Sequence, residues 1–196
     1  ASAQHSVGNA YNFGQGVDDH EQAFAWYSKS AEQGNADGQF RLGELHHIGL
    51  GVEQDHEQAF TWYSKSAEQG NASAQHSVGN AYNFGQGVEQ DYEQAFAWYS
   101  KSAEQGNASA QHSVGFAYDF GQGVEQDYEQ AFAWFSKSAE QGNTSAQHSV
   151  GFFYGFGQGV EQDYEQAFAW YSKSAEQGNA SAQHSVGNAY NFGQGV

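Results

Sequence analysis

Histidine is the residue type in this sequence that is best suited to bind a metal, and the chain has nine of them. Five occupy one position of a recurring pattern and would form a ladder: His5, His76, His112, His148 and His184. Packed helices lie about 10 Å apart, whereas zinc is held by bonds of about 2 Å. Neighbouring rungs therefore cannot share one ion, and we expect half-buried rings with a structural role.

A second histidine group, His46, His47 and His56, departs from this ladder. No Asp or Glu stands beside it at a spacing diagnostic of metal ligands. The recurring acidic residues Glu89, Asp91 and Glu93 lie outside any EF-hand pattern, and helix capping together with a solvated acidic edge accounts for them. We predict neither a metal site nor a cofactor.

Other catalytic patterns are also missing. No Ser-His-Asp order, phosphate-binding loop or isolated pair of carboxylates stands out. The segment Gly85-Gln86-Gly87 follows a helical pattern and lacks the strand that a dinucleotide fingerprint requires. We therefore predict that the protein is not an enzyme.

The composition excludes further classes. Six basic residues face 23 acidic ones, which gives a net charge of −17, whereas nucleic-acid binders cluster Lys and Arg. No apolar run approaches the roughly 20 residues of a membrane span. The absence of Cys excludes disulfides and zinc knuckles. Aromatic residues make up 16% of the chain, which is too many for a disordered acidic segment.

The elements that must position these residues come from a repeat of 36 residues. The register is set by Trp26, Trp62, Trp98, Trp134 and Trp170, which follow one another at this spacing and are interpreted as structural. Near-identical units at fixed spacing are typical of a solenoid, in which each unit packs on its neighbours.

Each unit contains two helical patterns. In the copy that begins at Ala72, Val78 and Ala81 belong to an apolar stripe of the first helix, with Gly79 at a predicted close contact. That helix ends in the glycines of the segment 84–87. The second begins at Asp91, whose carboxylate can cap the backbone N–H of Gln94, and ends at Gly106.

The repeated pattern resembles the Sel1-like repeat family, which is related to the tetratricopeptide repeats. In one copy its elements are Ala74, Gln75, Val78, Gly79, Tyr82, Gly85, Gly87, Val88, Asp91, Ala95, Trp98, Tyr99, Lys101, Ala103 and Gly106. The resemblance implies an all-α, right-handed solenoid of antiparallel helix pairs, with about 11 helices. It would be a single domain over residues 1–196, with five full repeats and a terminal half repeat. The resemblance also implies a non-catalytic scaffold that binds other proteins.

Differences between the copies concentrate on the first helix of the unit, which lines the concave face of helical solenoids. We predict a binding groove for a protein or peptide there, formed by Asn80, Asn83, Phe116, Asp119, Phe152 and Phe153. The alternative is that the additional phenylalanine rings fill gaps between helices.

A rival interpretation is an extracellular filament. The sequences of residues 1–17 and 180–196 are identical, and neither end has an atypical capping unit, so we expect a segment of a longer array or end-to-end stacking. Asn-x-Ser sequons predict possible glycosylation at Asn71, Asn107, Asn143 and Asn179. We favour an extracellular or periplasmic location. The partner is then either another protein or a second copy of the chain.

Overall fold

The computed structural model describes residues 19–196, and within this range it has ten α-helices and no strand. The all-α class and the helix pairs are therefore confirmed, while the first of the roughly 11 expected helices lies outside the described residues. Each helix has 13 residues, and two types alternate along the chain. The first helix of a unit, called the A helix, is α3 (Ala36–Ile48), α5 (Ala72–Phe84), α7 (Ala108–Phe120), α9 (Thr144–Phe156) or α11 (Ala180–Phe192). The second, called the B helix, is α2 (His20–Glu32), α4 (His56–Glu68), α6 (Tyr92–Glu104), α8 (Tyr128–Glu140) or α10 (Tyr164–Glu176).

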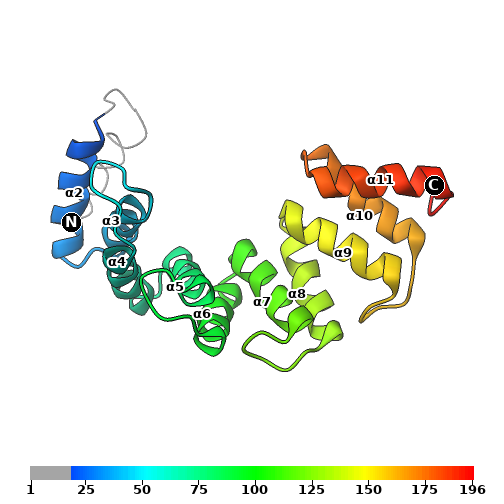
Figure 1. The fold of residues 1–196 in the computed structure, drawn as a ribbon, viewed down its shortest axis with the longest axis horizontal. Coiled ribbons are helices and arrows are strands. Elements are labelled where there is room, and N and C mark those ends of the chain that lie inside the picture. Colours follow the sequence, from blue (N-terminus) through cyan, green and yellow to red (C-terminus); the bar gives the residue numbers. More distant parts are fainter. Residues whose placement is uncertain (1–18) are drawn as a thin grey trace. The chain divides into compact units, whose positions relative to one another are not determined.

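The chain forms two compact units, Ala1–Ser102 and Ala103–Val196. Within each unit, consecutive helices pack against one another (Figure 1). In the first unit α2 packs on α3, α3 on α4 and α4 on α5, and in the second unit each helix from α7 to α10 packs on the next. A short turn joins each B helix to the next A helix, and a longer loop joins each A helix to its B helix.

Side-chain caps start the helices where the sequence predicts. The Asp91 carboxylate accepts a hydrogen bond from the backbone N–H of Gln94 at 3.0 Å, and its counterparts cap the other B helices in the same way. The A helices end at a left-handed glycine, such as Gly85 with φ of +66°. This conformation is accessible to glycine without the steric cost that a Cβ brings.

The core lies between A and B helices and is built largely from small residues and rings. In the second unit it contains Ala131, Phe135, Ala146, Val150 and Phe153, each at most 1% exposed. In the first unit Leu42 and Leu45 take part, together with the buried ring of Tyr27. Trp62, Trp98 and Trp170 pack against the core clusters and are only partly buried.

Glycine at the centre of α3, α5, α7 and α9 allows the B helix that follows each of them to approach closely. A Cβ placed on Gly79 would lie 2.5 Å from Cδ1 of Tyr99, and one on Gly115 would lie 2.7 Å from Cδ1 of Phe135. Real Cβ atoms do not come that close to a ring carbon, so the close contact predicted for this glycine is confirmed.

A repeated set of hydrogen bonds joins the C-terminal ends of the B helices to the N-terminal ends of the A helices. Buried Gln147 donates from Nε2 to the carbonyl of Ala139 at 3.3 Å, and its Oε1 accepts from Gln177 at 2.7 Å. Buried Ser174 donates to the carbonyl of Thr144 at 2.8 Å. These bonds satisfy polar groups inside the stack, where an unpaired group would cost about 1–3 kcal/mol.

Candidate partner-binding surface

The second unit exposes two pairs of phenylalanine rings on its A helices. Phe116 and Phe120 on α7 lie with ring centroids 4.4 Å apart, and Phe152 and Phe156 on α9 lie 4.5 Å apart. Their exposed fractions are 43%, 58%, 37% and 65% in that order. We call these four residues the Phe surface. Rings at positions i and i+4 of a helix share one face, which explains the pairing.

Phe153 does not belong to this surface, because it is only 1% exposed. Its ring lies 5.4 Å from that of Phe135 and 6.3 Å from that of Phe132, in the core of the second unit. Of the two roles considered for the additional rings, Phe153 has the packing role, and its assignment as a partner-contacting residue is corrected. The sequence contained the signal: Phe153 replaces a residue of the buried stripe, the counterpart of Ala81.

The other predicted contact residues are not part of the Phe surface. Asn80 and Asn83 belong to the first unit, where Asn80 Oδ1 accepts a hydrogen bond from the Tyr99 hydroxyl at 2.8 Å. The backbone carbonyl of Asn83 accepts from Gln90 Nε2 at 2.7 Å. Asp119 is half-buried on α7, and burial raises the pKa of its carboxyl group. The partner-binding role of these three residues stays a prediction.

The counterparts of the Asn80–Tyr99 pair show what the change to phenylalanine does. On α7 and α8 the pair becomes Phe116 and Phe135, so both the amide and the hydroxyl are replaced by apolar groups. On α9, Phe152 replaces the asparagine while Tyr171 keeps its hydroxyl. Phe152 thus removes a hydrogen-bond acceptor without an accompanying change at Tyr171, and its partly exposed ring lies 6.3 Å from the buried ring of Phe153.

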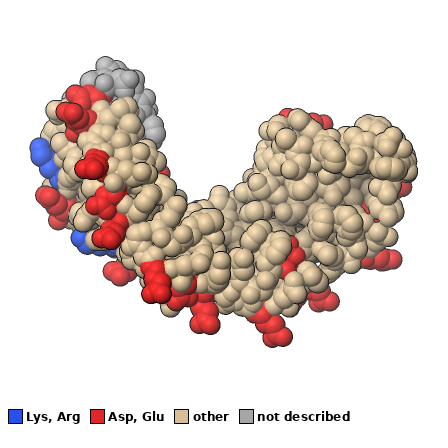
Figure 2. Space-filling model, in the orientation of Figure 1, with Lys and Arg blue, Asp and Glu red and all other residues tan. Residues whose placement is uncertain are grey.

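The helices that carry the Phe surface have almost no charge. Among the Asp, Glu, Lys and Arg residues of the chain, α7 holds only Asp119, and α9 and α11 hold none. The acidic residues of the second unit otherwise lie on the B helices, in the loops before them or next to their ends. In Figure 2 most of the visible face over α9 and α11 is accordingly uncharged. Apolar and charged groups of this unit thus lie on different helices.

The histidine ladder contacts the aromatic rings of the B helices. His112 lies 5.3 Å from the ring of Phe135, and His148 lies 5.4 Å from the ring of Tyr171. Burial lowers the pKa of both imidazoles. His47 and His56 form a separate pair at 5.1 Å. Within residues 19–196, no group of three or more His, Cys, Asp or Glu side chains is arranged to hold a metal ion.

The sequon asparagines are the caps of the A helices, a role that the sequence analysis missed. Asn107 Oδ1 accepts from the backbone N–H of Ala110 at 2.9 Å, and Asn71, Asn143 and Asn179 cap in the same way. Asn35 also caps its helix, although the sequon is lost there because Asp37 replaces serine. Capping therefore explains the recurrence of asparagine, and glycosylation stays a prediction.

Cation–π pairs are a second feature that was missed. Each tryptophan of the repeat lies under the ammonium group of the lysine three residues later, as Lys65 lies over Trp62 at 3.9 Å. The spacing i, i+3 places the two on one helix face. All five lysines of the chain are engaged in this way.

Taken together, the alternating 13-residue helices, the glycine contacts and the repeated hydrogen bonds define a tetratricopeptide-like helical-repeat protein with an exposed aromatic surface. The Sel1 repeat model matches residues 1–35, 36–71, 72–107, 108–143, 144–179 and 180–196. The chain therefore belongs to the Sel1 repeat family, whose members are generally protein-interaction scaffolds and typically non-catalytic.

Solved structures of Sel1 repeat proteins are similar to this chain. One is a protective antigen present in uropathogenic Escherichia coli strains, with a TM-score of 0.91 and 41% identity over 98% of this chain. Another is a Sel1 repeat protein from Oxalobacter formigenes, with a TM-score of 0.91, 35% identity, and coverage of 96% of this chain and 78% of that one. Immunity protein Pa5087 from Pseudomonas aeruginosa shares the fold at a TM-score of 0.61 and 24% identity, over 92% of this chain and 67% of that one.

This chain spans 41% of the length of the Escherichia coli antigen. No curated protein matches the sequence. In the part of the chain that the structure describes, no helix is both long and apolar enough to cross a membrane.

Proposed function

We propose that this protein is a non-catalytic scaffold whose second unit binds an apolar segment of another protein through the Phe surface. The observation that carries the proposal is the 37–65% exposure of four rings, Phe116, Phe120, Phe152 and Phe156. The two helices that carry them, α7 and α9, contain a single charged residue, Asp119. Exposed clusters of large aromatic rings are typical of interaction sites, because burying them on binding removes much apolar area from water.

The chemistry of the surface selects the partner. Because α9 has no Asp, Glu, Lys or Arg, it gives little electrostatic attraction to a charged segment. A complementary segment would present aliphatic or aromatic side chains to the rings, as an amphipathic helix does when it lies in an apolar groove.

Peptides selected from a phage-displayed library on the wild-type protein provide the test. They should be rich in apolar side chains, and their affinity, measured by titration calorimetry, should fall at least tenfold for the variant F116N/F135Y/F152N. A tenfold loss corresponds to about 1.4 kcal/mol. Selected peptides that bind this variant as tightly as wild type would refute the proposed surface.

The substitutions in this variant are taken from the chain's own repeats, which protects the fold. F116N together with F135Y restores the pair seen at Asn80 and Tyr99, and F152N supplies the asparagine that Tyr171 lacks. F135Y alone serves as the control, since it leaves all four rings of the Phe surface in place. Thermal unfolding should verify that each variant is folded.

A further inference from the structure

A cavity of about 170 Å³ lies among α9, α10 and α11 in the second unit. Its aromatic walls are Phe156, Tyr164, Phe168 and Tyr171, and Ala189 lies on the side of α11. None of the residues that line it is charged. A cavity of roughly 150 Å³ with apolar walls is large enough to bind benzene. The size and the walls therefore suit one uncharged six-membered ring.

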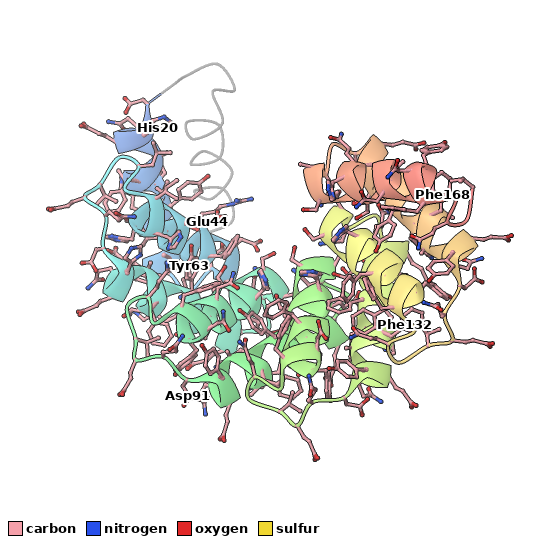
Figure 3. The ribbon with its side chains drawn as sticks, turned by 45° about the vertical axis from the view of Figure 1, so that its right-hand side comes forward. His20, Glu44, Tyr63, Asp91, Phe132 and Phe168 are labelled. Carbon is pink, nitrogen blue, oxygen red and sulfur yellow. The ribbon has the colours of Figure 1, made fainter. Side chains whose placement is uncertain are left out.

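The neighbouring repeat shows which group fits this space. One unit earlier, Tyr128, Phe132 and Phe135 are the counterparts of three of the walls, and Phe153 stands where Ala189 stands. The Phe153 ring lies 5.4–6.3 Å from these three rings and is buried. Figure 3 labels the corresponding walls Phe132, on α8, and Phe168, on α10. The protein thus fills one copy of the space with a phenyl ring of its own and leaves the next copy open.

The open copy differs from the filled copy in its polar groups. Tyr171 replaces Phe135, and its hydroxyl forms a hydrogen bond with Ser185, another residue of the cavity wall. Gly155 replaces Asp119, and a Cβ placed on it would lie 3.7 Å from the Tyr171 hydroxyl, so this hydroxyl faces the space that the missing side chain leaves. Burial raises the pKa of Tyr171 to about 12, so its hydroxyl stays protonated at neutral pH.

We propose that the α9–α10–α11 cavity binds a phenolic ring, with the ring in the position that Phe153 occupies one repeat earlier and its hydroxyl beside Tyr171 and Ser185. The ring would belong either to a free phenol or to a tyrosine side chain of a partner. The second source rests on the proposed function, since Phe156 belongs to both the cavity and the Phe surface.

A related cavity of about 290 Å³ lies among α3, α4 and α5 in the first unit, with Tyr63, Ser77 and Ala81 in the corresponding places. It is also lined by His47 and His56, whose counterparts in the α9–α10–α11 cavity are Gly155 and Tyr164. The experiment therefore starts from the variant A81F, which places a ring in this second space.

Phenol binding to A81F is measured by ligand-observed NMR and by calorimetry. We expect saturable binding with one phenol per chain, and at least a tenfold loss of affinity in A81F/A189F, because the new ring takes the place of the ligand. The matched control A81F/N188F adds the same ring one position earlier, where Phe152 stands in α9, and should bind phenol as A81F does. Equal binding by A81F/A189F, or no binding by A81F at millimolar phenol, would overturn the proposal.

Two further measurements distinguish the contribution of the ligand hydroxyl from that of its ring, and a partner's tyrosine from a free phenol. Phenol should bind A81F more tightly than toluene does, and Y171F, which copies Phe135, should reduce this preference. A tyrosine-containing peptide that binds more tightly than phenol identifies a protein partner, whereas the reverse order identifies a small molecule. F116N/F135Y removes one ring of the Phe surface and changes no residue that lines the cavity, so its phenol binding should equal that of wild type even if the proposed function fails.

Discussion

Two adjacent residues of α9 show how one helical position decides the role of a side chain. Phe152 is 37% exposed, whereas Phe153 is 1% exposed and lies in the core. Consecutive helical residues point about 100° apart, so neighbours of the same type can belong to different faces. The change from Ala81 to Phe153 altered packing, and the change from Asn80 to Phe152 altered the surface.

Buried histidines make stability depend on pH. Burial lowers the pKa values of His112 and His148. Once the pH falls below about 6.5, the ordinary histidine pKa, the unfolded chain therefore binds more protons than the folded chain does. The free energy of unfolding should therefore fall as the pH drops from 7.5 to 5. Urea denaturation at a series of pH values measures this.

The variant H112Q/H148Q isolates this contribution. Its loss of stability on acidification should be smaller than that of wild type. The raised pKa of Asp119 acts in the opposite direction, because the folded state then holds its proton more tightly than the unfolded chain does. D119N should therefore steepen the loss. Identical profiles of unfolding free energy against pH for wild type and H112Q/H148Q would show that these two histidines do not cause the loss of stability in acid.

At the scale of the helix, the contact between an A-helix glycine and a B-helix ring can be tested at two equivalent positions. In G115A the new Cβ would meet the Phe135 ring at 2.7 Å, so unfolding should require about 1–3 kcal/mol less free energy, the usual cost of overpacking. The measurement is the denaturation midpoint in guanidinium chloride, with the m-value compared between variants.

Gly187 provides the matched control, because it is the same position in α11 but a Cβ there would have no atom within 4 Å. G187A should stabilise the protein by roughly 0.5–1 kcal/mol, since alanine is the better helix former. If G115A and G187A shift the midpoint in the same direction, the close contact does not determine the choice of glycine.

Much of the helical structure could be predicted from residues alone, because its determinants are local. Asp91 caps, Gly85 ends a helix, and the alternation of apolar residues gives the buried stripe. Bonds between helices could not be predicted in this way. The Gln147–Gln177 hydrogen bond joins residues 30 apart, and only the packed structure shows which amide faces which.

The candidate site was predicted less completely than the fold. Comparison of the copies found the variable helix, and Phe116 and Phe152 are indeed exposed there. It did not find the cavity beside Ala189, since a cavity is an absence of atoms that several helices create together. The asparagine caps were missed because the sequon offered a competing explanation for the same residues.

Considered as a whole molecule, the protein combines a charge of −17 with helices of very different polarity. All five lysines lie over tryptophans of the B helices, so the basic groups do not offset the acidic groups evenly over the surface. Repulsion among the carboxylates should oppose the compact state at low ionic strength.

Salt should accordingly stabilise the protein. The Debye length falls from about 30 Å at 0.01 M to about 8 Å at 0.15 M, which screens the repulsion between separate acidic groups. We expect Tm, measured by circular dichroism at pH 7.5, to rise over this range, and to rise equally in NaCl and KCl. A falling Tm would mean that favourable pairs such as Arg41–Glu44 outweigh the net repulsion.

The hydrogen bonds between helices also bear on how such a chain can change in length. Gln69 bonds Gln39, Gln141 bonds Gln111 and Gln177 bonds Gln147, so the partners are of the same type at each of these junctions. Deleting or duplicating 36 residues would rejoin a glutamine to a glutamine and a serine to a backbone carbonyl. Recombination between near-identical coding segments could therefore vary the number of units without leaving a buried polar group unpaired at the new junction.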